Sequence, residues 1–177
     1  MPVTKKALMY TIQEHMHRFA LWISARAAQR GVKKFTIENL NLLFEKINFR
    51  SEINFAIERI NNSNDFEKFH IEICNKMIEN ASFKLTYGRA SKILAMYFKT
   101  ISINQNTSSG ILPQLIHPPI DAILLNAIGD DHVSLKMLKK IKWTQLSQKK
   151  YWELINHLKG NNLPINWELE SYWHPRN

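Results

Sequence analysis

The stretch that decides the fold is ALMYTIQEHMHRFALWISARAAQR, residues 7–30. Apolar side chains recur along it in steps of three and four residues, at Leu8, Ile12, Met16, Phe19, Ile23 and Ala27. This spacing puts them on one face of an α-helix, so it predicts a long amphipathic helix that is ended by Gly31.

The same periodicity continues through most of the remaining sequence. Further helices are expected at about 36–47, 51–60, 64–80, 89–101, 118–128, 131–141, 144–159 and 164–173. The expected N-caps of the first three are Thr36, Ser51, and Asn64 or Asp65. The segment Asn104–Gly110 consists mainly of loop-forming residues and predicts an exposed loop. Because no segment alternates like a strand, the sequence predicts an all-α, compact, multi-helix protein, with residues 1–177 forming a single helical domain.

Composition restricts the partners of this domain. A hydrophobic content of 45% in 177 residues is enough for one sizeable core. The 24 Lys and Arg residues exceed the 15 Asp and Glu residues, and the net charge of +9 favours an anionic partner such as nucleic acid or an acidic membrane surface. No apolar run approaches the roughly 20 residues that span a bilayer, and the N-terminal residues lack the apolar core of a signal peptide. A cytoplasmic monomer without membrane contact is therefore expected.

Metal-binding and disulfide chemistry have little support in the sequence. Cys74 is the single cysteine, which excludes an intramolecular disulfide, a cysteine-held iron–sulfur cluster and a Cys-rich zinc site. His15 and His17 lie two residues apart, which on a helix places them about 200° from one another. No metal and no cofactor are expected.

Two neighbouring features could carry chemistry. The first is Tyr87-Gly88-Arg89-Ala90-Ser91-Lys92, which is expected to be a tight glycine turn with unusual backbone angles that opens a basic helix. Free amides and basic side chains at such a turn favour phosphate, so the predicted DNA-backbone-binding residues are Tyr87, Gly88, Arg89, Ser91 and Lys92. The second is Pro118-Pro119-Ile120-Asp121, where a helix is expected to begin and to place Asp121 in its first turn. The helix dipole there favours the ionised carboxylate.

These two segments resemble the core of the helix-hairpin-helix DNA glycosylases. The hairpin would lie within residues 76–102 and the helix of the catalytic aspartate within residues 118–129. In this resemblance Asp121 takes the place of the catalytic aspartate, Gly88 that of the second hairpin glycine, and Arg89 that of the basic residue after it. Thr86 and Leu85 stand where the family has glycine and proline, so the hairpin is degenerate. The resemblance implies a helical enzyme without an iron–sulfur cluster that flips a nucleotide out of duplex DNA and hydrolyses its N-glycosidic bond.

The resemblance also implies a mechanism. Bifunctional members have a lysine directly after the hairpin arginine, whereas this chain has Ala90, and Lys92 is expected to face another way on the helix. We therefore expect a monofunctional glycosylase in which the Asp121 carboxylate stabilises the sugar cation and orients a water, leaving an abasic site. Lys92 is the second catalytic candidate, because a lysine that reached the pocket would add strand cleavage by β-elimination. The excised base is left open, and DNA repair and antiphage defence are both compatible roles.

The predicted base pocket lies on the first helix. Trp22 has Arg18 and Arg26 four residues away on either side, which suits a polar cleft, and His15 and His17 are expected on the same wall. Other aromatic residues that could stack on a flipped base, but that belong more often to a core, are Trp143, Trp152, Trp167, Tyr172 and Trp173.

Two other functions fit the same sequence. The first is a non-catalytic helical DNA-binding protein in which Asp121 only caps its helix. The second is a protein-interaction module whose charge maintains solubility. A run of lysines outnumbers Asp130 and Asp131 by six to two and is either a DNA-facing surface or a solvated face. It comprises Lys136, Lys139, Lys140, Lys142, Lys149 and Lys150.

Overall fold

The computed structural model describes residues 10–103 and 111–174. Within these two ranges the regular structure is helical and no strand occurs, so the all-α prediction is confirmed. None of the helices in the same ranges is long and apolar enough to cross a membrane. The predicted loop at Asn104–Gly110 lies outside the described residues.

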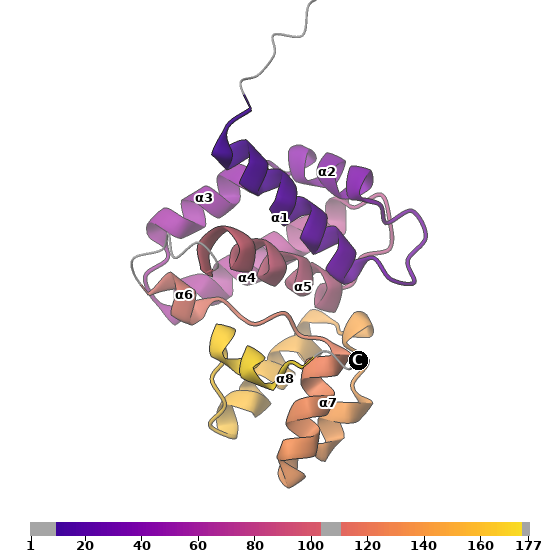
Figure 1. Cartoon of the computed structure of the whole chain (residues 1–177), viewed down its shortest axis with the longest axis vertical. Coiled ribbons are helices and arrows are strands. Elements are labelled where there is room, and N and C mark those ends of the chain that lie inside the picture. The colour runs from indigo at the N-terminus through magenta and orange to yellow at the C-terminus, as the bar shows by residue number, and fades with distance from the viewer. Residues whose placement is uncertain (1–9, 104–110, 175–177) are drawn as a thin grey trace, which may run out of the picture.

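The first five helices pack together, and the fifth of them is buried (Figure 1). They are α1 (Ile12–Ala28), α2 (Ile37–Lys46), α3 (Phe49–Arg59), α4 (Ser63–Asn80) and α5 (Tyr87–Phe98). Nearly every residue of α5 is buried, because α1 and α4 pack along it. A helix hydrophobic on most of its surface belongs in a core, and α5 fills that role here.

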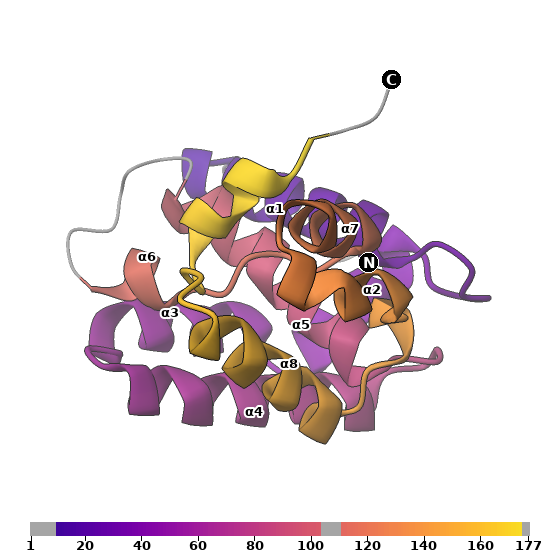
Figure 2. The same ribbon diagram turned by 90° about the horizontal axis from the view of Figure 1, so that it is seen from below.

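The second half of the chain packs on one side of these helices (Figure 1). It contains the π-helical turn η1 (Lys99–Ile103), α6 (Leu112–Leu115), α7 (Ala122–Asp131), the 3₁₀ helices η2 (Val133–Lys140) and η3 (Trp143–Gln145), α8 (Gln148–Gly160) and the 3₁₀ helix η4 (Trp167–Tyr172). Helix α7 packs against η2, and η3 packs against α5. Figure 2 shows α8 beside α4, where the Asn75 side chain donates to Gln148 Oε1 over 2.9 Å.

Helix starts are set by capping side chains. Thr36 accepts a hydrogen bond from the Asn39 amide, as predicted. The other two predicted caps are wrong, because α3 begins after Asn48 in the left-handed region and α4 begins after Asn62. In each case the observed cap lies two or three residues before the residue that was predicted to cap the helix.

The helix predicted from residue 118 begins later. Its first residue is Ala122, and Asp121 is its N-cap with extended backbone angles, which corrects the predicted first-turn position. The segment expected as a helix over 131–141 is the 3₁₀ helix η2, and the one expected over 144–159 is divided into η3 and α8 by the cap residue Ser147.

Gly88 has a different role from the predicted one. Its φ is not positive, and it lies in the first turn of α5, so the predicted glycine turn with unusual backbone angles is wrong. The Gly88 amide donates to the carbonyl of Leu146 over 3.1 Å. A Cβ at this position would lie 2.0 Å from the carbonyl oxygen of Trp143. Glycine is therefore required because η3 and its following residue approach the α5 backbone closely.

Two histidines are buried in the core between α4, α5 and α8. The Nδ1 atom of His70 hydrogen-bonds the Tyr87 hydroxyl at 3.0 Å, and that of His117 hydrogen-bonds the Tyr151 hydroxyl at 2.9 Å. The Trp152 indole also donates to Tyr87, over 3.1 Å. Burial lowers the pKa of His70 from 6.5 to about 3 and lowers that of His117 well below its ordinary value, so both are neutral at pH 7.

Replacing Gly88 by alanine should destabilise the protein strongly. The added methyl group would overlap a backbone carbonyl that cannot move without shifting η3. We expect a loss of about 2–4 kcal/mol in the free energy of unfolding, measured by urea denaturation. Gly160→Ala is the matched control, because a Cβ added there would meet no atom of the described residues within 4 Å. A similar loss for both substitutions would contradict the close approach at Gly88.

Stability should fall as the pH drops below about 6.5. The unfolded chain binds protons at His70 and His117 in this range, whereas the folded chain does not, so both destabilise the folded state, and His70 costs about 2 kcal/mol by pH 5. His70→Gln keeps an acceptor for Tyr87 and does not titrate. The unfolding free energy of this variant, measured at pH 7 and pH 5, should therefore change by about 2 kcal/mol less than that of the parent. An equal change in both proteins would show that His70 is not the group responsible.

Candidate active site

Lys92 and Asp121 form an ion pair between α5 and α7. The distance from Lys92 Nζ to Asp121 Oδ2 is 3.0 Å, and the side chains are only 9% and 13% exposed. Lys92, which was expected to face another way on the helix from Ala90 and to be the less favoured catalytic candidate, therefore does reach Asp121. The angle around α5 determines its position only relative to Ala90 on the same helix, whereas the packing of α7 determines which α5 residue meets the aspartate.

Three donors orient the Asp121 carboxylate. Its Oδ1 accepts the amide hydrogen of Leu124 over 2.9 Å, which caps α7. Its Oδ2 accepts from Lys92 and from the indole nitrogen of Trp173, the latter over 3.1 Å. A negative charge at this end of a helix is also stabilised by the helix dipole. The site therefore holds one carboxylate in a fixed orientation.

The Lys92 amine lies in a dry, aromatic environment. Burial lowers its pKa, while the charge and hydrogen bond of Asp121 oppose that shift and Arg89 adds to it. Its Nζ lies 4.5 Å from the centroid of the Trp143 ring. A lysine with a lowered pKa beside a carboxylate that can accept its proton is a suitable nucleophile or general base.

The five predicted DNA-backbone residues are all buried, which corrects the expectation that they face DNA. They are Tyr87, Gly88, Arg89, Ser91 and Lys92. The Arg89 guanidinium donates to the carbonyls of Ala28 and Arg30, the second over 2.9 Å, so it holds the end of α1. Two backbone amides in the first turn of α5 also have partners within the protein, because the Gly88 amide donates to the Leu146 carbonyl and the Arg89 amide donates to the Thr86 carbonyl. Both cations of this segment and these two amides are thus already bonded within the protein.

The four residues of the predicted base pocket lie on α1 and are not brought to Asp121. Trp22 stacks on Phe19 with ring centroids 5.9 Å apart. Arg18 pairs with Glu14 over 2.7 Å, and His15 bonds the Tyr10 hydroxyl. The fourth, the half-buried His17, bonds the hydroxyl of Tyr97 at 2.7 Å. In the described ranges, none of the contacts of these residues reaches the ion pair.

Trp143 and Trp173 are the aromatic residues at the ion pair. Both belong to the aromatic residues that the sequence offers for base stacking, but its charge pattern favoured Trp22 instead. Their positions depend on tertiary contacts, since Trp143 lies on η3 and Trp173 follows η4. Glu170 of η4 pairs with Lys99, which fixes the segment that carries Trp173 over the carboxylate. Trp173 is 36% exposed, so it is the partly solvent-facing cover of this site.

The candidate site contains no set of metal ligands. Throughout the part of the chain that the structure describes, no group of three or more His, Cys, Asp or Glu side chains could hold a metal ion. The reactive groups that this chain itself brings to the site are the Lys92 amine and the Asp121 carboxylate.

Two substitutions at Asp121 separate its capping role from its charge. Asp121→Asn retains an oxygen for the Leu124 amide, whereas Asp121→Ala removes the cap. Both remove the partner of Lys92. We expect the alanine variant to be less stable than the asparagine variant by about 1 kcal/mol in chemical denaturation. Equal stabilities would indicate that the Asp121 cap contributes nothing to α7.

Comparison with protein-family models, with curated proteins and with solved structures finds no match to this chain. The resemblance to the helix-hairpin-helix glycosylases therefore stays a prediction, and it depends on residues 88–94 and 119–124. The contact between Lys92 and Asp121 is independent of that resemblance. This contact brings together in space the two segments on which the resemblance rests, which the sequence relates only by their order along the chain.

Proposed function

We propose that this protein is a DNA N-glycosylase that excises a damaged or modified base, with Lys92 as the nucleophile and Asp121 as its proton acceptor. The observation that carries the proposal is the largely buried ion pair of Lys92 and Asp121 in a strongly basic protein. Breaking a DNA glycosidic bond in this way requires an oriented carboxylate and a nucleophile at one carbon atom, and this pair supplies both.

The proton transfers of the reaction balance within the pair. The Lys92 ammonium transfers a proton to Asp121 Oδ2, to which it is already hydrogen-bonded. The neutral amine then forms a bond to C1′ of the flipped nucleotide while the C1′–N bond breaks, and the base leaves with the bonding electrons. The protonated Asp121 returns the proton to the departing base. A second amine proton moves to O4′ as the C1′–O4′ bond breaks, which opens the sugar ring and leaves a protonated imine between Lys92 and C1′.

The lowered pKa of Lys92 supports this route over water attack alone. A buried lysine loses its proton more readily than an exposed one, and the loss produces the nucleophilic form. The proposal thus replaces the monofunctional route expected from Ala90 with a bifunctional one, in which the imine permits strand cleavage by β-elimination. A water oriented by Asp121 would give an abasic site instead, and the products distinguish the two routes.

The covering indole of Trp173 gives the site a means of excluding water. Its bond to Asp121 Oδ2 occupies the carboxylate in the free protein. A flipped base would displace this indole and could stack on it or on Trp143, since aromatic faces hold extruded bases. The protein would act as a monomer on cytoplasmic DNA, in repair or in antiphage defence.

A non-catalytic DNA-binding protein is the second candidate. It is favoured by the bond from the Leu124 amide to Asp121 Oδ1, because a capping aspartate needs no catalytic role to be useful. In that case Lys92 and Asp121 would only join α5 to α7.

Borohydride trapping tests the proposal directly. The protein is incubated with duplexes carrying oxidised purines, alkylated purines or bulky modified pyrimidines, and released bases are identified by mass spectrometry. Borohydride should reduce the imine and leave a covalent protein–DNA product with the substrate duplex. Lys92→Gln should abolish this product, and Asp121→Asn should slow base release by about 10²–10³-fold, the usual effect of removing one well-placed electrostatic group.

Duplex binding by the same variants is the control. Both should retain affinity within a few-fold of the parent, because neither side chain is exposed enough to make the main backbone contacts. If the protein releases a base but no trapped product forms, and Lys92→Gln leaves base release unchanged, then Lys92 is not the nucleophile and the attacking group is a water. Duplex binding without base release from any of these substrates would favour the non-catalytic candidate.

A further inference from the structure

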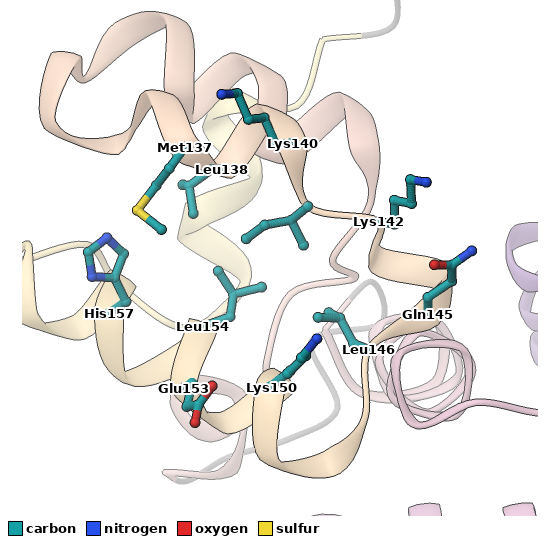
Figure 3. A pocket seen from close by; sticks show the side chains of 11 residues that line it. Met137, Leu138, Lys140, Lys142, Gln145, Leu146, Lys150, Glu153, Leu154 and His157 are labelled. Carbon is teal, nitrogen blue, oxygen red and sulfur yellow. The ribbon is translucent and has the colours of Figure 1, made fainter.

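A groove lies between η2, η3 and α8. Its volume is about 610 Å³. Figure 3 shows Leu138 and Leu154 pointing into it, and Ile141 also lines it, so its floor is apolar. The rim carries Lys140, Lys142 and Lys150 together with one carboxylate, Glu153, so positive charge is in excess there.

The three rim lysines are available to a ligand. All are exposed, and none forms an ion pair within residues 10–103 and 111–174. The lysines next to them in the sequence do have acidic partners: Lys139 pairs with Asp130, and Lys149 lies 3.9 Å from Glu153. In Figure 3 Lys150 reaches toward the hollow from α8, whereas Lys140 and Lys142 lie on the other side of the groove with their amines pointing outward. The groove therefore combines unpaired positive charge with an apolar floor.

We propose that this groove binds the sugar–phosphate backbone of the DNA strand that carries the target base. The inference rests on the proposed function and locates its DNA contact. A nucleic acid backbone presents phosphate charge and the apolar edges of deoxyribose in alternation, which matches lysines above a floor of leucine and isoleucine. The groove replaces the buried segment Tyr87–Lys92, for which backbone binding had been predicted.

The segment 143–146 connects the groove to the ion pair. Leu146 lines the groove, and its carbonyl accepts the Gly88 amide hydrogen. Trp143 lies three residues before Leu146, and its ring faces the Lys92 amine. A strand that follows the groove would therefore pass beside the place where a flipped nucleotide meets Lys92. This continuity favours DNA over an acidic protein segment, which would need no access to the pair.

Charge removal at the rim tests the inference. The triple variant Lys140→Gln, Lys142→Gln, Lys150→Gln is compared with the parent for binding to an unmodified duplex, as a function of salt concentration. Each lost phosphate contact lowers the slope of log K against log salt by about 1, so we expect a slope reduced by about 2–3 and an affinity at least tenfold weaker at about 100 mM salt. The control variant Lys33→Gln, Arg59→Gln, Lys68→Gln removes the same charge from α3, α4 and the loop before α2, outside the groove.

The outcomes for the groove and for the reaction are separable. An unchanged slope in the rim variant, or an equal loss in the control, would overturn the groove inference and leave trapping through Lys92 unaffected. A reduced slope without base release from any duplex would support the groove and overturn the proposed reaction. Tighter binding to polyglutamate than to duplex DNA of equal charge, lost in the rim variant, would overturn the DNA assignment in favour of an acidic protein partner. Base release restored in the rim variant by saturating protein would support the groove as a binding element.

Discussion

The ion pair between Lys92 and Asp121 joins the buried helix α5 to the helix that begins after Asp121, and the candidate site depends on it. Such a pair is a poor way to stabilise a fold. Removing two charges from water costs several kcal/mol per ion, and well-packed apolar residues often do as well in the same space. The capping bond to Leu124 explains the aspartate alone, but it does not explain a buried lysine aimed at it. The proposed chemistry at the Lys92 amine would account for both residues together.

The surroundings of the pair follow from the close contact at Gly88. With no side chain at this position, the backbone of η3 approaches α5 and is held by the bond between Gly88 and Leu146. That approach carries the Trp143 ring to the Lys92 amine on one side and places Leu146 in the basic groove on the other. The same glycine thus aligns the amine, its aromatic neighbour and the groove.

The sequence predicts the helices better than it predicts the site. Apolar spacing locates most helices within a few residues, and Thr36 and Asp121 mark helix starts because their side chains replace missing backbone acceptors. The contact of Lys92 with Asp121 was not predicted, because helical periodicity defines a face of α5 but not the element that covers it. Gly88 was misinterpreted for a related reason, since a glycine needed for a positive φ and one needed for close packing look alike in sequence. Trp22 was preferred over Trp143 and Trp173 for its charged neighbours on α1, whereas the site is assembled by residues distant in the chain.

In the free protein the indole of Trp173 covers the Lys92–Asp121 pair, as would suit an enzyme that must select one nucleotide before it reacts. Trp173 bonds the same carboxylate oxygen that accepts the Lys92 proton, and Glu170 anchors its segment to Lys99. Opening the site would therefore cost a hydrogen bond and the burial of part of an indole, and only a nucleotide that replaces both contacts could compensate for that cost. A backbone strand held in the groove would raise the local concentration of such a nucleotide without itself uncovering the amine. Binding to DNA in general and reaction at one base would then be controlled by different residues, the former by the lysine rim and the latter by the indole above Asp121.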